Sequence, residues 1–193
     1  MLGLLSETDP KWVKIVESDL STFLSDHLYA EQKAASNGFS FVIQYPEYRE
    51  ITDKMGAYAL EESAHFKLVL DFMNQRNIPL QRDQKSAYVH HLRHFFTKTD
   101  NRVDNMVNRM LIASLIEARS CERFALFSKE TSDPELQAFY HGLIKEEIGH
   151  YKLFQVLARK FQDDETVSLK WKKLLQYEAD YMKNTGKTAL VHG

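Results

Sequence analysis

The chain has 193 residues, of which 44% are hydrophobic and 27% are charged, and its formal net charge at pH 7 is −2. This balance is ordinary for a folded globular protein and unlike that of a disordered chain. A net charge so close to zero excludes a uniformly basic protein, so any contact with nucleic acid must come from a local patch. The length suits a single domain over residues 1–193 with a sizeable core.

Two further features of the composition narrow the class of protein. The chain has seven glycines and four prolines, which are too few for the many turns of an all-β fold, and its one cysteine, Cys121, excludes an internal disulfide and any four-cysteine metal site. The first ten residues lack the basic and apolar stretches of a signal peptide, and no apolar run reaches the roughly 18 residues of a membrane span. We therefore expect a cytoplasmic protein with no membrane partner.

Apolar residues recur three and four positions apart in the first part of the chain, which predicts two long helices. The first begins near Asp9-Pro10, where a capping residue precedes a proline that helices tolerate in their first turn, and it ends near Gln44. Tyr45-Pro46 forms a turn, and the second helix covers residues 47–76.

Three more helices follow a long connection over residues 77–102, which has a candidate short helix at residues 86–96. The third and fourth long helices are predicted over residues 103–130 and 134–161, on either side of a tight turn. A shorter fifth helix covers residues 167–182, and the residues after it are expected to fray. Two helical hairpins joined by one long crossover are typical of a ferritin-like four-helix bundle, here with an additional C-terminal helix.

The second and fourth long helices each carry one Glu-x-x-His pair, Glu62 with His65 and Glu147 with His150. Three residues along a helix place both side chains on one face, so that one metal ion can bind a carboxylate oxygen and an imidazole nitrogen. Bundles that hold two metal ions add one Glu from each of the other two helices. Glu31 is the candidate on the first helix, and Glu117 and Glu122 are the candidates on the third.

Two arguments about the third helix point in opposite directions. Glu117 lies about as far before the turn near residue 132 as the Glu147/His150 pair lies after it, whereas Glu122 lies about 8 Å too close to the turn. In contrast, the sequence around Glu122 resembles the sequence around Glu31, which favours Glu122. Because a ligand misplaced by about 8 Å cannot bind the same metal ion, Glu117 is the predicted ligand.

The predicted ligands lie among apolar helix positions, and buried carboxylates are very unfavourable unless they hold metal ions or protons. Oxygen donors with two imidazoles suit iron, manganese less well, and a structural zinc site poorly. Three nearby polar residues, Asp26, His27 and Glu122, could contact these ligands. Asp26 and His27 could equally occupy ordinary polar helix positions, and Glu122 could form a surface pair with Arg119.

The crossover over residues 77–102 is basic and rich in aromatic residues. Five basic residues oppose two acidic ones there, a net charge of +3 before any histidine is protonated. Such a segment can bind a phosphate backbone and stack bases, although it can also be a solvated connection. The candidate contacts with a nucleic acid are Arg82, Lys85, Arg93, Lys98 and Arg102.

Four blocks of the sequence resemble the MiaE-type tRNA hydroxylases, a family of ferritin-like di-iron enzymes. They are residues 26–35, EESAHF at 61–66, IEARSCERF at 116–124 and KEEIGHYKLF at 145–154. The block at 116–124 is the specific one, because isolated Glu-x-x-His pairs occur throughout the ferritin-like proteins.

The resemblance implies a monooxygenase that hydroxylates the isopentenyl group of a hypermodified adenosine next to the tRNA anticodon, with dioxygen as co-substrate. It implies a di-iron centre held by six ligands: Glu31, Glu62, His65, Glu117, Glu147 and His150. Because no flavin, nicotinamide or iron–sulfur motif is present, the electrons must come from an external donor protein or reductase. The alternatives are an iron-storage ferritin, a peroxidase of the rubrerythrin type, which would normally carry a four-cysteine segment, and a bundle that binds no metal.

Overall fold

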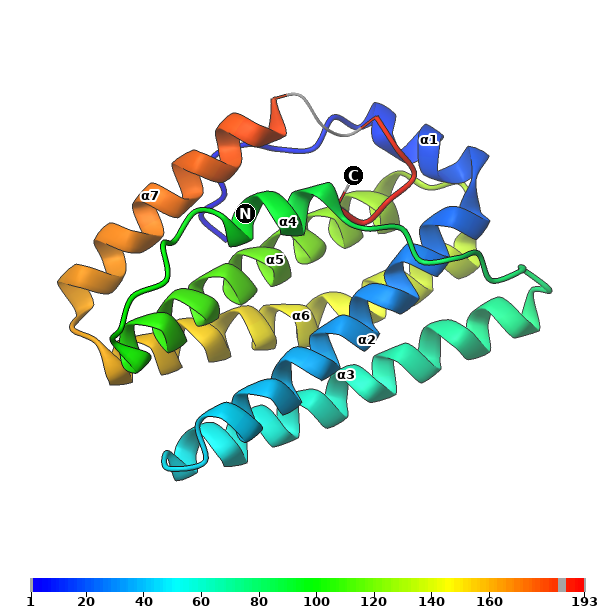
Figure 1. The fold of residues 1–193 in the computed structure, drawn as a ribbon. Coiled ribbons are helices and arrows are strands. Elements are labelled where there is room, and N and C mark those ends of the chain that lie inside the picture. Colours follow the sequence, from blue (N-terminus) through cyan, green and yellow to red (C-terminus); the bar gives the residue numbers. More distant parts are fainter. Residues whose placement is uncertain (1, 184–186, 193) are drawn as a thin grey trace. The chain divides into compact units, whose positions relative to one another are not determined.

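Seven helices and no strand make up the part of the chain that the computed structural model describes, residues 2–183 and 187–192 (Figure 1). The helices are α1 (Lys11–Ser18), α2 (Leu20–Gln44), α3 (Arg49–Gln75), α4 (Ala87–Arg93), α5 (Arg102–Glu130), α6 (Pro134–Phe161) and α7 (Asp164–Met182). The second, third and fourth predicted long helices, the short helix of the crossover and the C-terminal helix are present, and the first predicted helix is divided into α1 and α2. None of the helices in these residues is long and apolar enough to cross a bilayer.

The prediction of one uninterrupted helix before residue 44 was wrong. The chain breaks at Asp19, whose backbone leaves the helical region with φ −148° and ψ 65°. Its side chain accepts a hydrogen bond from the backbone N–H of Thr22 at 3.1 Å, so that Asp19 caps α2. Apolar periodicity continues through the break, which is why the sequence pattern alone does not reveal it.

The chain forms two compact units, each built on one helical hairpin. The first unit contains Met1–Glu17, Lys85–Thr188 and His192–Gly193, and the second contains Ser18–Gln84 and Ala189–Val191. In the second unit, α2 and α3 lie side by side (Figure 1). A Cβ atom added at Gly38 would lie 2.9 Å from the side chains of Tyr58 and Ala59, so only glycine permits this close approach of the helices.

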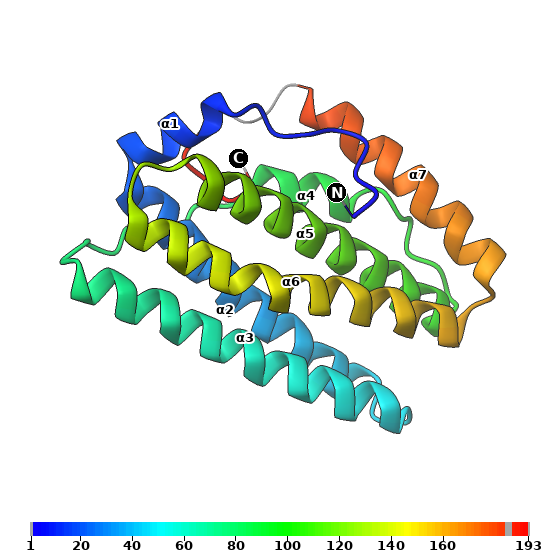
Figure 2. The ribbon, with the colours of Figure 1, turned by 180° about the vertical axis from the view of Figure 1, so that it is seen from behind.

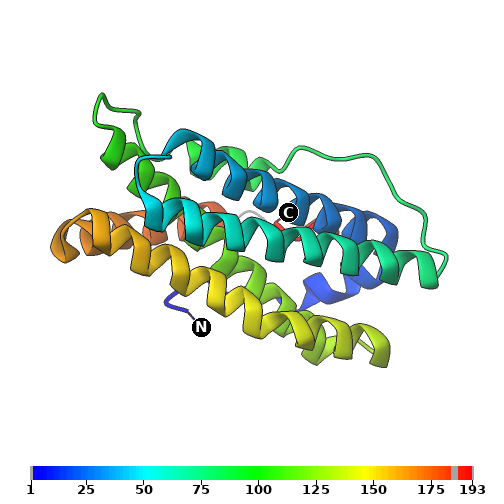
Figure 3. The same ribbon diagram turned by 90° about the horizontal axis from the view of Figure 1, so that it is seen from below.

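The first part of the crossover is fixed along α2 within the second unit (Figure 3). The backbone N–H of Gln81 donates to Ser25 Oγ at 2.9 Å, and Ser21 Oγ donates to the Pro79 carbonyl at 2.7 Å. Lys33 Nζ lies 2.6 Å from Asp83 Oδ1. These contacts hold residues 79–83 against α2, although these residues form no helix.

In the first unit, α5 and α6 lie side by side, and α4 and α7 contact α5 (Figure 2). The turn between α5 and α6 is held by Glu17 of the preceding segment. Its Oε1 accepts hydrogen bonds from Thr131 Oγ1 and from the N–H and Oγ of Ser132, at 2.9 to 3.1 Å. Asp133 then caps α6 and Pro134 occupies the first turn, as the sequence predicts.

The residues after Met182 were expected to fray, and for residues 189–192 that expectation was wrong. In the second unit, Val191 is fully buried and its backbone N–H donates to Asp26 Oδ2 at 2.8 Å. In the first unit, His192 Nε2 lies 3.1 Å from Ser120 Oγ, and the imidazole stacks on the ring of Tyr88 with 5.1 Å between the ring centroids.

Candidate metal centre

The second unit gathers three of the predicted ligands on facing positions of α2 and α3. Glu31, Glu62 and His65 are each at most 5% exposed. His65 Nδ1 lies 3.5 Å from Glu62 Oε2 and 3.7 Å from Glu31 Oε2. Two carboxylates and one imidazole therefore converge on one point inside this hairpin.

His27 supports this group from the preceding turn of α2. Its Nε2 lies 2.6 Å from Glu31 Oε1, and its side chain is completely buried. Although burial by itself raises the pKa of Glu31, hydrogen bonds with Glu62, His27 and His65 outweigh this effect and lower the pKa. Glu31 is thus held as a carboxylate, the form that binds metal ions. Of the two interpretations of His27, contact with a predicted ligand and an ordinary polar helix position, the structure favours the first.

The first unit gathers the other three predicted ligands between α5 and α6. Glu117, Glu147 and His150 are all buried, and one ligand atom from each lies within 4.8 Å of the others. This group also consists of two carboxylates and one imidazole.

Two contacts between α5 and α6 explain the height of Glu117. Ser114 Oγ donates to the Tyr151 carbonyl at 3.1 Å, and Cys121 Sγ lies 4.0 Å from the Ile144 carbonyl. Residue numbers in each of these antiparallel pairs add up to the same value, so Glu117 lies level with Ile148, midway along the Glu147-to-His150 turn. The contacts on either side of Glu117 fix the register of the two helices at the site.

Glu122 is buried away from this group, so its predicted pairing with Arg119 exists but is not a surface contact. Glu122 Oε1 accepts from the backbone N–H of Thr8 at 2.8 Å, and Oε2 accepts from Thr8 Oγ1 at 2.7 Å and from Arg119 Nη1 at 2.9 Å. Arg119 is completely buried and also binds Glu178 of α7 and the Ser6 carbonyl. Glu122 therefore joins the N-terminal segment to α5.

Sequence reasoning missed this polar core around α5. Arg123 donates to Thr8 Oγ1 and its guanidinium lies 5.0 Å from the Trp12 ring, while Ser120 contacts His192. The one available signal was the run of polar residues at 117–123 in a helix whose neighbours are apolar, since buried polar residues need partners. Its partners were not predictable because they lie more than 50 residues away along the chain.

Asp26 was the other candidate neighbour of the ligands, and the structure places it elsewhere. Its carboxylate receives the Val191 N–H, and burial raises its pKa. Asp26 thus anchors the C-terminal residues in the second unit. The predicted tRNA contacts at Arg82, Lys85, Arg93, Lys98 and Arg102 are all exposed.

The donor set of the two groups fits iron. Together they offer four carboxylates and two imidazoles, the oxygen-rich donors with nitrogen that iron binds in proteins. Cys121 belongs to neither group: its Sγ lies 4.0 Å from the Ile144 carbonyl, and burial raises the pKa of its thiol to about 11.

Two known tRNA hydroxylases are similar to this chain in sequence. The chain is 34% identical over 161 residues to the tRNA 2-(methylsulfanyl)-N(6)-isopentenyladenosine(37) hydroxylase of Pseudomonas putida KT2440, covering 83% of this chain and 77% of that protein. It is 29% identical over 147 residues to the hydroxylase of the same name from Salmonella typhimurium LT2, covering 76% of this chain and 53% of the relative. The chain thus spans about half the length of the Salmonella protein.

A solved structure and a family model complete the comparison. The solved structure of Protein 43 with aldehyde deformylating oxygenase activity from Synechococcus matches with a TM-score of 0.91 at 26% identity, over 98% of this chain and 95% of that one. This match confirms the predicted ferritin-like all-α fold. The model of the tRNA-(MS2IO6A)-hydroxylase (MiaE) family matches residues 2–193. The chain therefore belongs to the MiaE family of tRNA hydroxylases.

Proposed function

We propose that the two buried groups together hold two iron ions and that the protein hydroxylates the isopentenyl group of a hypermodified adenosine beside the tRNA anticodon. The observation that carries the proposal is the matching composition of the groups. Each hairpin buries one Glu-x-x-His pair together with one further Glu from the partner helix, the donor pattern of di-iron bundles.

The six proposed iron ligands are Glu31, Glu62, His65, Glu117, Glu147 and His150. When bound, an iron pair supplies the capacity to use dioxygen, two electrons and two protons to convert a C–H bond into C–OH and water. The residues around these six side chains hold and orient them and keep bulk water away from the site. His27 orients Glu31, and the Ser114 and Cys121 contacts keep Glu117 level with its partners on α6.

The family and the names of the relatives support tRNA as the substrate. Because hydroxylation consumes two electrons per turnover, a donor protein or reductase must deliver them. We place one candidate tRNA contact on the crossover. Lys85, Arg93, Lys98 and Arg102 are exposed in the first unit, and Arg82 is exposed in the second.

Nucleoside analysis of tRNA tests this function directly. A strain that lacks the protein should accumulate the isopentenyl nucleoside and lose its hydroxylated form, and the wild-type gene should restore it. A variant with Glu147→Gln should not restore it. Hydroxylated nucleoside at the normal level in the deletion strain would refute the proposed substrate.

A further inference from the structure

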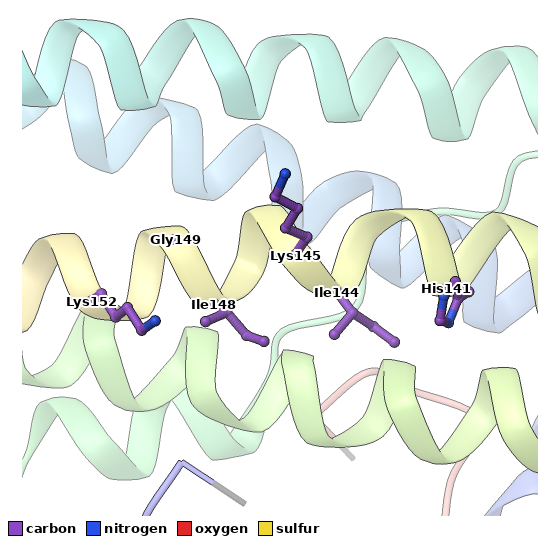
Figure 4. A pocket seen from close by; sticks show the side chains of 6 residues that line it. All are labelled: His141, Ile144, Lys145, Ile148, Gly149 and Lys152. Carbon is purple, nitrogen blue, oxygen red and sulfur yellow. The ribbon is translucent and has the colours of Figure 1, made fainter.

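One face of α6 carries a hollow of about 390 Å³ (Figure 4). Its lining residues all come from this helix and share one face because they are three or four positions apart. They are His141, Ile144, Lys145, Ile148, Gly149 and Lys152. The two isoleucines make its wall apolar, and the two lysines place positive charge at its rim.

Gly149 keeps the hollow open. Glycine weakens a helix interior, yet a Cβ atom at position 149 would meet no atom within 4 Å, so packing within the chain does not require glycine there. Gly38 on α2 is the contrast, because its neighbours leave no space for a Cβ atom. Gly56 and Gly142 have equally open Cβ positions, and Gly149 differs from them in lying among the residues that line the hollow.

The lysines at the rim are available to an anion. Among the described residues, no hydrogen bond or ion pair involves the Nζ atom of Lys145 or Lys152, whereas Lys33 and Lys67 pair with aspartates. The hollow therefore combines an apolar wall with two cations that have no acidic partner.

We propose that this hollow receives a nucleotide of the tRNA anticodon loop adjacent to the modified adenosine. Its base would lie against Ile144 and Ile148 over Gly149, and its phosphates would contact Lys145 and Lys152. The inference rests on the proposed function and adds a location for the substrate to it. Proteins read RNA loops through bases that leave the stack, while basic side chains follow the backbone.

Two observations favour a nucleotide as the occupant. The volume of the hollow is in the range of small-ligand sites and suits one protruding group, whereas the flat surface of an acidic protein would not fill it. Gly149 also directly precedes His150, a proposed iron ligand, so a nucleotide bound here lies close to the helix that carries two of those ligands.

The first experiment fills the hollow and measures binding of a fluorescent anticodon stem-loop RNA that contains isopentenyladenosine. Gly149→Leu is compared with Gly142→Leu, since Gly142 is also exposed on α6, has open space around its Cβ position, and does not line the hollow. Both variants should melt at a higher temperature than the wild type, because leucine is a better helix former than glycine. Only Gly149→Leu should weaken RNA binding, by about tenfold.

The second experiment reverses the charge at the rim. Lys145→Glu combined with Lys152→Glu should weaken binding of the same RNA and lower the slope of log affinity against log salt by about 1.4, as expected for two lost phosphate contacts on a single strand. The control, Lys11→Glu with Lys54→Glu, changes the net charge equally at exposed positions outside the hollow and should leave the slope unchanged. The iron content of both variants should equal that of the wild type.

Three results would overturn the inference, and they are distinguishable. Hollow variants that bind RNA like the wild type, while a variant of the crossover does not, would remove the hollow and keep the proposed function. Hollow variants that retain RNA binding but lose affinity for an acidic two-iron ferredoxin would assign the face to an electron carrier. A wild-type protein that neither binds nor hydroxylates the stem-loop would refute the proposed function as well.

Discussion

The Nε2 atom of His27 lies 2.6 Å from Oε1 of Glu31, and both side chains are buried in the second unit. Neighbours that orient a ligand typically change metal affinity by about 10- to 100-fold when they are removed. We therefore expect His27→Ala to lose iron to a competing chelator at about 10-fold lower chelator concentration than the wild type. His141→Ala, at an exposed histidine of α6, is the control.

A second variant at position 27 distinguishes loss of this contact from general damage to the fold. His27→Gln retains a side-chain N–H that can donate to Glu31, so it should recover part of the iron affinity. Equal chelator resistance in the wild type and both His27 variants would show that His27 is only a packed core residue.

A pH-dependent contribution to stability is expected from Glu17. Its hydrogen bond with Lys14 and those with the turn at Ser132 lower its pKa from 4.5 to about 2. Because the folded-state pKa lies below the unfolded one, this carboxylate stabilises the fold above about pH 4.5, and the contribution disappears as the pH falls toward 2. Glu17→Gln should therefore lower the melting temperature at pH 7 and have almost no effect near pH 2.

Thermal unfolding of the wild type and the variant between pH 2 and 7 checks this. Glu47→Gln, at an exposed position in the turn before α3, is the matched control. A difference in melting temperature that stays constant over the whole range would mean that the amide disturbs packing and that the charge of Glu17 contributes nothing.

The sequence predicts the helices well because their periodicity and capping are local properties. Asp133-Pro134 is one example, since the capping residue and the proline both act within one turn. The break at Asp19 was missed because apolar spacing continues across it. The buried contacts of Glu122 with Thr8 and of Asp26 with Val191 join residues more than 100 positions apart, and no local pattern encodes such partners.

The candidate ligands were likewise predictable where local spacing determines their positions. Spacing alone places Glu62 with His65 and Glu147 with His150, because residues three positions apart lie on the same face of a helix. The height of Glu117 followed from counting residues to the turn, and the Ser114 and Cys121 contacts agree with that count. His27 could not be assigned, because its rotamer and the direction of its imidazole depend on packing around α2.

Binding of tRNA through the crossover gives a further prediction. Neutralising Arg82, Lys85 and Arg93 together should weaken RNA binding and flatten its salt dependence, because all three are exposed cations. Iron content should stay at the wild-type level. A binding curve and salt slope identical to those of the wild type would mean that residues 77–102 are only a connection.

The two acids of α5 give the sharpest test of the site. Glu117 faces Glu147 and His150, whereas both carboxylate oxygens of Glu122 are occupied by Thr8 and Arg119. We expect Glu117→Gln to lose iron or to leave a single ion, because it removes a charged ligand while the volume of the side chain is kept. Glu122→Gln should retain both ions and lose about 1–3 kcal/mol of unfolding free energy, because Arg119 is left with a weaker buried acceptor.

Metal analysis and denaturant unfolding of the two variants must therefore give opposite results. The register of α5 on α6 makes this expectation strict, since five residues rotate a helix by about 140° and both acids cannot face the same partners. Glu122→Gln should unfold at lower denaturant with its iron intact, and Glu117→Gln should lose iron with a smaller change in the stability of the metal-free protein. Iron lost only from the Glu122 variant would overturn the assignment, and it would require α5 to be rotated from the register that the Ser114 and Cys121 contacts define.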